Sequence, residues 1–192
     1  MYELYFKKFN EMIPLTAEEE NIIRSYLSPK KVRKKQFLLQ DNEVCKHIAF
    51  VEKGALRAYT ISEKGSEHII QFALEGWLIS DLYSFLTGEP ATYNIDALEN
   101  SELLLISNTA HEELIQRLPK YETWTRLQVT GAYIAMQRRL TSIISLPLEE
   151  RYSHFINLYP HIVQRVPQHM IASYMGLTPE TLSRVRKRLA SK

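Results

Sequence analysis

The chain has 192 residues, 45% of them hydrophobic, and a formal net charge of +2. It is long enough to bury a core in one large or two small domains, and its near-neutral charge excludes a uniformly basic architectural protein. Its one cysteine, Cys45, excludes an internal disulfide framework and leaves too few thiolates for a four-cysteine iron–sulfur or structural zinc site. No apolar run approaches the ~18 residues of a transmembrane helix, so we expect a cytoplasmic protein without a membrane partner.

The first elements that the sequence predicts are a helix and a basic run. Thr16 is a capping residue ahead of AEEENIIRSYL, whose first turn is acidic, so a helix is expected from there to Ser28-Pro29. The run KKVRKK at residues 30–35 could contact DNA phosphates or another anionic surface. A solvated strand edge is the favoured interpretation, because lysines also prevent pairing between exposed sheet edges.

Residues 32–107 change to short segments with β character, separated by turn signals at intervals of about eight to twelve residues. The segments are QFLLQ, HIAFVEKG, ALRAYTIS, EHIIQFAL, TYNIDALE and ELLLIS. Gly54, Gly65 and Gly76 are expected at tight turns, and LISDLYSFLTGEP is expected to form a short helical turn. The pattern predicts a small antiparallel roll or barrel.

Two further helices are expected, from Asn108 to Leu118 and from Tyr121 to Ser145. The longer helix carries two apolar stripes, which are Val129, Tyr133, Met136, Leu140 and Ile143, and Trp124, Leu127, Gly131 and Ile134. Two stripes need two partners, so one is expected to pack on the roll and the other on a second copy of the chain across a two-fold axis. Burial of the long helix within a monomer is the alternative. Another amphipathic helix, LEERYSHFINLY, is expected between Pro147 and Pro160.

The C-terminal stretch has the form of a helix-turn-helix. Thr178 is a capping residue and Pro179 takes the first helical position, so a helix begins there. At ~100° per residue its apolar and polar residues separate, with Leu182, Val185 and Leu189 on one side and Glu180, Ser183, Arg184 and Lys187 on the other. A shorter helix is expected upstream from Gln168 to Met175, with Ile171, Ala172 and Met175 inward, and Gly176 makes the turn.

Positive charge is concentrated on this stretch, because residues 166–192 hold five Lys or Arg residues against Glu180 alone. A helix-turn-helix places its second helix in the DNA major groove, where Glu180 would accept from cytosine N4 and Arg184 would donate to guanine O6 and N7. A two-helix hairpin with merely solvated arginines is the alternative. The expected DNA-binding residues are Gln168, Thr178, Pro179, Glu180, Ser183, Arg184, Lys187 and Arg188, of which Glu180, Ser183 and Arg184 read bases.

Roll, long helix and helix-turn-helix in that order resemble the Crp/Fnr family of transcription regulators over nearly the whole chain. GLTPETLSRVRKRL is similar to that family's recognition helix, with Glu180 and Arg184 at its motif positions, and FVEKGALRAY resembles its first hairpin. The resemblance implies an α+β chain with a jelly-roll-like antiparallel β-roll at residues 1–119, a long dimerisation helix at 120–145 and a DNA-binding domain at 146–192. It also implies a homodimer on near-palindromic double-stranded DNA, with half-sites roughly 34–36 Å apart, and RNA polymerase as a further partner.

The roll departs from the family's cyclic-nucleotide-binding members. Where these carry Gly-Glu-Leu and then an Arg-Ser pair that holds the cyclic phosphate, this sequence reads Ser80-Asp81-Leu82 and Ala91-Thr92. A threonine hydroxyl replaces neither the charge nor the fork geometry of arginine. No Lys or Arg lies between Lys64 and Arg117, so an anionic ligand would be repelled unless Arg57 or the long helix supplied a cation. We therefore expect a degenerate ligand pocket at those five positions, no cofactor, and an effector other than cyclic AMP.

Other classes of function find less support in the residues. A cupin-like metal enzyme would need clustered histidines, but the six histidines include no His-x-His pair, and neither a nucleophile elbow nor a phosphate loop is present. Cys45 is expected to be semi-exposed and inert, with a redox-sensitive thiol as the alternative. Six aromatic residues of the roll could line a ligand pocket or form core, namely Tyr59, Phe72, Trp77, Tyr83, Phe85 and Tyr93. The second hypothesis for the whole chain is a small-molecule or cyclic-nucleotide-binding module with vestigial DNA binding.

Overall fold

The computed structural model describes residues 1–190, which divide into two compact units. The first unit comprises residues 1–60 and 71–128, and the second comprises residues 61–70 and the chain from Val129 onward. Helix α5 (Pro119–Ser145) contributes residues to both units. None of the helices in the described part of the chain combines the length and the apolar character needed to cross a membrane.

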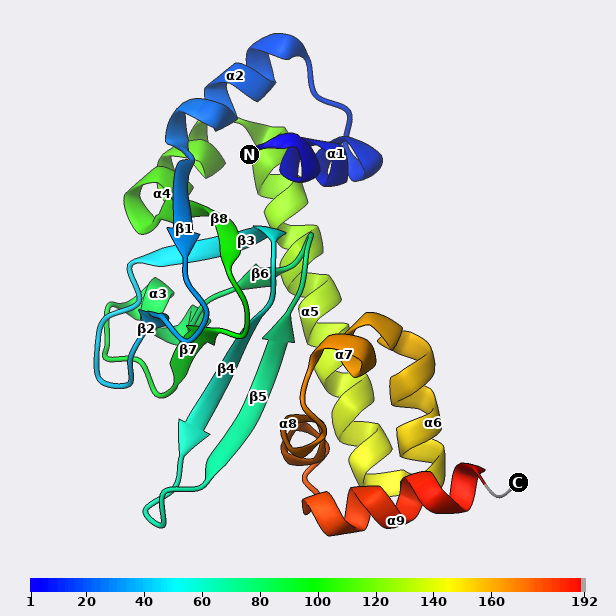
Figure 1. Ribbon diagram of the computed structural model, residues 1–192. Helices are drawn as coiled ribbons and strands as arrows, with labels where there is room; N and C mark the ends of the chain where they lie inside the picture. The colour runs from blue at the N-terminus through cyan, green and yellow to red at the C-terminus, as the bar shows by residue number, and fades with distance from the viewer. Residues whose placement is uncertain (191–192) are drawn as a thin grey trace. The chain divides into compact units, whose positions relative to one another are not determined.

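The strands form two sheets in an antiparallel roll, as predicted (Figure 1). The first sheet has the order β1 (Ser28–Val32), β8 (Ser101–Ser107), β3 (His47–Lys53) and β6 (Leu78–Ile79). The second has the order β2 (Phe37–Leu39), β7 (Asn94–Ala97), β4 (Leu56–Ile61) and β5 (Glu67–Ala73). The basic run begins in β1, an edge strand, and continues into the exposed turn that follows it.

Helices occupy both ends of the chain, which confirms the predicted α+β class. Those of the first unit are α1 (Glu3–Met12), α2 (Ala17–Tyr26), α3 (Leu82–Thr87) and α4 (Asn108–Arg117). Those of the second are α6 (Leu148–Leu158), α7 (Pro160–Arg165), α8 (Gln168–Tyr174) and α9 (Pro179–Ala190). The sequence did not predict α1, α7 or β6.

The space between the two sheets is the first core of the roll. Inward positions alternate along each strand, so that Ala49 and Val51 of β3 face the same buried cluster as Leu103 and Leu105 of β8. Gly54 makes the β3–β4 turn with φ +107°, and a Cβ there would overlap Ser101. Glycine is therefore required at this turn both by the backbone conformation and by the lack of space.

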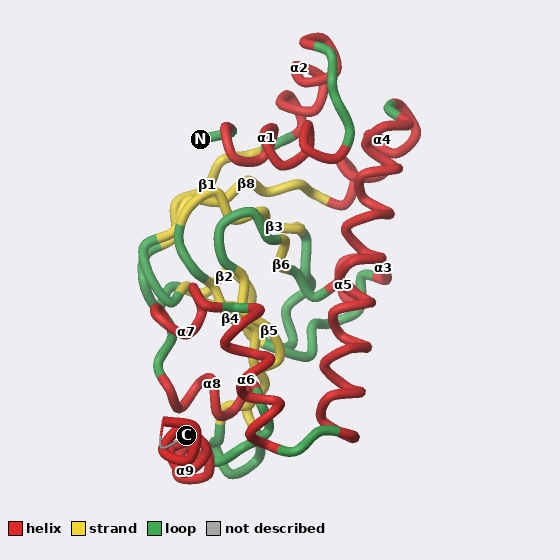
Figure 2. The backbone as a smooth tube through the Cα atoms, turned by 90° about the vertical axis from the view of Figure 1, so that its right-hand side faces the viewer, coloured by secondary structure: helices red, strands yellow, loops and turns green. Residues whose placement is uncertain are grey.

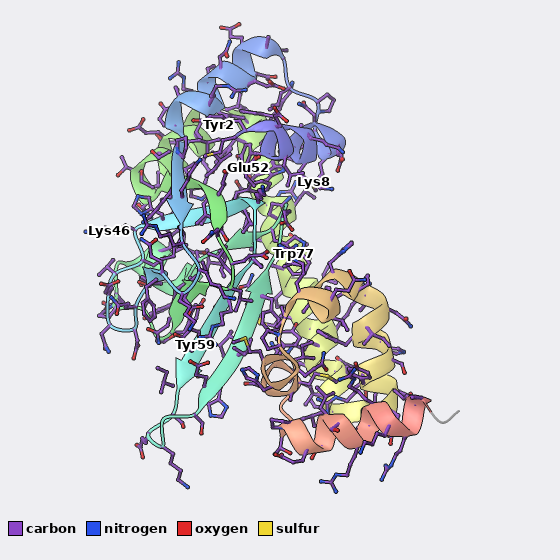
Figure 3. All side chains as sticks on the ribbon, in the orientation of Figure 1. Tyr2, Lys8, Lys46, Glu52, Tyr59 and Trp77 are labelled. Atoms are coloured by element: carbon purple, nitrogen blue, oxygen red, sulfur yellow. The ribbon has the colours of Figure 1, made fainter. Side chains whose placement is uncertain are left out.

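A second core lies on the outer face of the first sheet, where α1, α2, α4 and the start of α5 gather at one end of the roll (Figure 2). Phe9 of α1 stacks on Trp124 of α5 with ring centroids 5.0 Å apart. The first turn of α1 lacks a side-chain cap of its own. Glu52 of β3, labelled in Figure 3, instead accepts hydrogen bonds from the backbone N–H groups of Leu4 and Tyr5, at 3.3 and 2.7 Å. Tertiary contact thus completes this helix.

A buried histidine is expected to make the stability of this core depend on pH. His111 Nδ1 lies 2.9 Å from the hydroxyl of Tyr121, and burial lowers the pKa of His111 from its ordinary 6.5. Below pH 6.5 the unfolded chain binds a proton at this histidine that the folded chain does not bind. The contribution of His111 to the free energy of unfolding should therefore be complete above that pH and decline below it. Urea unfolding of the wild type and of His111→Gln should show this decline, with a smaller slope in the variant. Equal slopes for His111→Gln and the wild type would contradict the assignment.

Candidate nucleic-acid interface

Helix α9 separates its side chains by polarity, as the sequence predicts. Leu182 and Val185 are buried, and the helix packs on α8 and α6 in the second unit (Figure 1). The side chains at the opposite positions are exposed, namely Glu180, Ser183, Arg184 and Lys187. A polar face that starts in the first turn of a helix suits the base edges of a major groove.

The beginning of α9 is fixed by local chemistry. Gly176 takes a left-handed backbone conformation with φ +69°, which ends the preceding helix and turns the chain. The hydroxyl of Thr178 accepts the backbone N–H of Thr181 at 3.2 Å, so this threonine caps α9. Pro179 is the first helical residue, where a missing N–H costs nothing.

Charges on α9 are suited to different tasks. Hydrogen bonds from its own backbone N–H and from Thr178, with the charge of Arg184, lower the pKa of Glu180. Glu180 therefore stays ionised and can only accept hydrogen bonds, which is the property that a cytosine amino group requires. Arg188, expected at a phosphate, forms an ion pair with Glu149 of α6 at 2.9 Å. The side chain of Arg188 is 70% exposed, so a phosphate can compete for the guanidinium.

Gln168 departs most from its expected role among the DNA-binding residues. It is the first residue of α8 and only partly exposed. Its side-chain oxygen is buried and receives no hydrogen bond from the described residues. A phosphate contact from Gln168 would therefore depend on its amide nitrogen.

The end of α8 is held by side chains that the sequence did not single out. Arg139 of α5 donates to the backbone carbonyls of Ile70 and Tyr174, and its guanidinium lies 3.8 Å from the centroid of the Tyr174 ring. Arg151 of α6 donates to the carbonyl of Met175. Cations at the C-terminal end of a helix satisfy its unpaired carbonyls and complement its dipole. No local pattern marks these arginines, because their partners lie 24 to 69 residues away in the chain.

Ser173 fastens α8 to the tip of the β4–β5 hairpin, which belongs to the same unit. Its hydroxyl accepts the backbone N–H of Ile69 at 2.9 Å and donates to the carbonyl of Glu67 at 3.0 Å. Both groups lie on β5, which is the edge strand of its sheet. One hydroxyl thus satisfies two edge groups and fixes the first helix of the pair.

Replacement of Arg139 tests whether this fastening positions the helix pair. Arg139→Ala should lower the free energy of unfolding of the second unit by about 1–3 kcal/mol, because two carbonyls lose a charged donor. It should also weaken binding to all DNA sequences alike, since Arg139 acts through α8. Thermal melting and DNA titration of the same samples provide the measurement, with exposed Arg138→Ala as the matched control. An unchanged melting temperature of Arg139→Ala would show that these contacts do not stabilise the second unit.

Four of the five residues expected to form a degenerate ligand pocket take part in hydrogen bonds within the roll. The buried carboxylate of Asp81 accepts the backbone N–H groups of Ser84 and Thr92, at 3.1 and 3.0 Å. Ala91 is buried, and its N–H and carbonyl are bonded to the backbone of Glu43 and Asn42. The remaining two positions are Leu82, which is exposed, and Ser80, whose carbonyl accepts the hydroxyl of Tyr93. The position at which the resemblance places the phosphate-holding arginine is thus taken by the buried side chain of Ala91.

Arg57, the residue of the roll that could have supplied a cation to an anionic ligand, is already paired with a carboxylate. Arg57 holds Asp96 through two hydrogen bonds, Nε to Oδ1 at 2.8 Å and Nη2 to Oδ2 at 3.0 Å, and both residues are buried. Its guanidinium also lies 4.0 Å from the centroid of the Tyr59 ring. Removing Asp96 from this pair would leave a buried unpaired charge, so Arg57 is not available to a phosphate.

Other candidate residues of the roll are also located by the structure. Cys45 is buried, not semi-exposed as expected, because its loop folds against the core, and this burial raises the pKa of its thiol. Tyr59, Phe72 and Phe85 belong to the core, Tyr93 is partly buried, and Trp77 and Tyr83 are exposed. Within the described residues, no three His, Cys, Asp or Glu side chains gather as a metal site would require.

Comparison with known proteins places this architecture. The family described as cyclic nucleotide-binding domain matches residues 29–118. The fumarate and nitrate reduction regulatory protein of Vibrio cholerae is 26% identical over 187 residues, which cover 90% of this chain and 74% of that protein. Among solved structures, FixK2 from Bradyrhizobium japonicum has a TM-score of 0.72 at 18% identity, with 86% of this chain and 85% of that chain covered.

A second solved structure names the family directly. A transcriptional regulator of the Crp/Fnr family from Eubacterium rectale has a TM-score of 0.70 at 17% identity, with 97% of this chain and 88% of that chain covered. These structures share the fold, and the regulatory relatives match along nearly the whole chain. The succession of roll, long helix and helix-turn-helix agrees with both comparisons, and together they support a regulator of the Crp/Fnr family.

Proposed function

We propose that this protein is a dimeric, sequence-specific DNA-binding transcription regulator without catalytic activity. The observation that carries the proposal is the exposed polar face of α9, with Glu180, Ser183 and Arg184 in its first turns and Leu182 and Val185 buried behind them. In this role Glu180 and Arg184 read bases. Thr178, Lys187 and Arg188 hold phosphates, and Gln168 assists through its amide nitrogen.

The dimer is proposed from the second half of α5. Its apolar stripe is exposed in the single chain, with 60% of Tyr133, 63% of Met136 and 58% of Leu140 accessible. Large side chains at spacings of three and four along one helix are typical of a coiled-coil seam. A second copy of the same helix is self-complementary to this stripe, and two recognition helices related by a two-fold axis suit a near-palindromic operator.

The roll is proposed not to respond to cyclic AMP. Ala91 lacks the guanidinium that would hold the phosphate, and Arg57 is committed to Asp96. No cofactor is assigned, and RNA polymerase is proposed as a further partner on the ground of similarity to regulators of the Crp/Fnr family.

Selection of bound sequences from a random DNA pool tests this function. The protein as isolated should retain a two-fold-symmetric motif, and its affinity should fall steeply with salt because phosphate contacts release counterions. Cyclic AMP added to the selection should change neither the motif nor the yield. A motif that appears only with cyclic AMP would contradict the proposed loss of the phosphate site.

Failure of the selection would separate the remaining possibilities. If only non-specific binding is recovered, the selection is repeated with cell extract. A motif that then appears would mean that an effector is required to set the two recognition helices in register. Non-specific binding in both selections would overturn the DNA-reading role, and would leave a small-molecule-binding module with vestigial DNA binding.

A further inference from the structure

The backbone donors in the first turn of α9 are each accounted for. Pro179 has no N–H, and the N–H of Leu182 donates to the carbonyl of Thr178 at 3.0 Å. The N–H of Thr181 donates to the hydroxyl oxygen of Thr178 at 3.2 Å, and the N–H of Glu180 donates to the carboxylate of its own side chain. A helix start leaves such donors without partners inside the helix. The exposed Glu180 side chain therefore takes part in the capping of α9 as well as in its polar face.

The hydroxyl of Thr178 joins these contacts. Its oxygen lies 3.1 Å from the hydroxyl oxygen of Thr181, and it also forms a hydrogen bond with the Glu180 carboxylate. A hydroxyl has one proton to donate and two lone pairs that accept. Because an ionised carboxylate only accepts, and bonds to a charged acceptor are the stronger ones, the proton of Thr178 goes to Glu180. The two lone pairs then accept the N–H and the hydroxyl proton of Thr181, which fills the capacity of Thr178.

We propose that Thr178 is a positioning residue for Glu180. Its hydroxyl holds the carboxylate where a cytosine amino group can donate to it, and Thr181 orients that hydroxyl by donating to its oxygen. The inference rests on the proposed base-reading role of Glu180. An ionised carboxylate has about four lone-pair sites, so the bonds within the protein leave acceptor capacity for cytosine N4. Since the hydroxyl proton of Thr178 is used inside the protein, the phosphate contact proposed for Thr178 comes from its backbone N–H.

A carboxylate that is already held reads a base at a lower entropic cost. Ordering a glutamate side chain on binding costs conformational entropy, and part of this cost is avoided when the free protein holds the side chain in place. The charge of Arg184 also acts on Glu180, but Arg184 is itself proposed to bind guanine. Thr178 is not proposed to contact a base, so its hydroxyl can hold Glu180 in the free and in the bound protein. The competing role for the two threonine hydroxyls is donation to DNA phosphates, which carries no sequence information.

Thr178→Gly tests the proposal, because glycine removes the hydroxyl and yet caps helices almost as well as threonine does. The whole protein is titrated with its operator and with an operator changed at the base pair that Glu180→Ala makes degenerate. The ratio of the two affinities should fall about fivefold in Thr178→Gly, since an unheld carboxylate discriminates less. The matched control Thr178→Ser should keep the ratio of the wild type. Equal weakening on both duplexes in Thr178→Gly would assign the hydroxyl to a phosphate and overturn the proposal.

Carboxyl titration by NMR in the free protein separates positioning from base reading. The hydrogen bond from Thr178 is one of the causes that lower the pKa of Glu180, so this pKa should rise in Thr178→Gly and stay low in Thr178→Ser. An unchanged pKa in Thr178→Gly with the circular dichroism of the wild type would overturn the positioning role and leave base reading intact. A lowered pKa in a wild type that binds both duplexes equally would overturn base reading by Glu180 instead, and the inference with it.

A second pair of variants covers the case in which Thr178→Gly does not fold. Thr181→Val removes the hydroxyl that orients Thr178 but keeps the backbone N–H that Thr178 caps, and Thr181→Ser keeps both groups. Thr181→Val should lower the ratio of the two affinities in the same direction as Thr178→Gly, while Thr181→Ser should keep the ratio of the wild type. Equal ratios for Thr181→Val and Thr181→Ser would overturn the orienting role of Thr181.

Discussion

Leu140→Glu combined with Met136→Glu is expected to convert the protein from a dimer to a monomer and to weaken operator binding by about 100-fold or more. Both side chains are more than half exposed in the single chain and lie one turn apart on α5. A two-fold seam would bring four carboxylates together in an apolar interface, where their charges are neither solvated nor paired. Light scattering after size-exclusion chromatography gives the oligomeric state, and titration with a full operator gives the affinity.

Two controls make this experiment specific. Gln137→Glu adds one negative charge, where the double variant adds two, on the same turn but off the apolar stripe, so it should leave the dimer intact. A DNA duplex that carries a single half-site should bind the double variant and the wild type alike, because one recognition helix pair suffices there. If the double variant remains dimeric, the seam lies elsewhere and the proposed role of the stripe is wrong.

Arg184→Ala is expected to cost about 1–3 kcal/mol in operator affinity and to relax discrimination at one base pair of each half-site. Arg184 lies one turn after Glu180 on the exposed face of α9, with a side chain that can donate to guanine O6 and N7 together. Repeating the DNA selection with the variant should return the same motif with one symmetric pair of positions degenerate. The measured quantity is thus the change at one position as well as the total affinity.

Lys187→Ala is the comparison for Arg184→Ala, because it lies on the same face but is proposed to contact phosphate. Its loss should weaken binding to all sequences alike and reduce the salt slope by about one. Loss of the same size on every sequence for Arg184→Ala would move Arg184 from base reading to phosphate contact. A change in the selected motif for Lys187→Ala would reverse the two assignments.

Elements with complete local signals were predictable from the sequence. Helix α2 begins where Thr16 and Glu19 form a reciprocal capping box, and α9 begins at Thr178 and Pro179, so each start depends on residues within one turn. Gly54, Gly65, Gly76 and Gly176 all take positive φ values at the turns expected of them. The strands of the roll other than β6 followed from alternation and turn spacing, since these depend on neighbours in the chain.

Elements completed by distant residues were not predictable in the same way. Helix α1 has Tyr2 at its N-cap position without a side-chain cap, and Glu52 supplies the missing acceptors from 47 and 48 residues away. Cys45 stands in a polar stretch that suggested partial exposure, yet its loop folds inward and buries it. No local pattern contains such information.

The features of the candidate site also divide into those that the sequence predicts and those that only the tertiary structure reveals. The sequence by itself determined the fold class, the polar face of α9 and the absence of an arginine at Ala91, because each depends on residue identity and helical or strand periodicity. Only the tertiary structure decided that Arg57 is neutralised by Asp96 and that Arg139 and Ser173 hold α8. The physical reason is that charge pairing and helix fastening are properties of side chains brought together across strands and helices, and residue order alone leaves those distances undetermined.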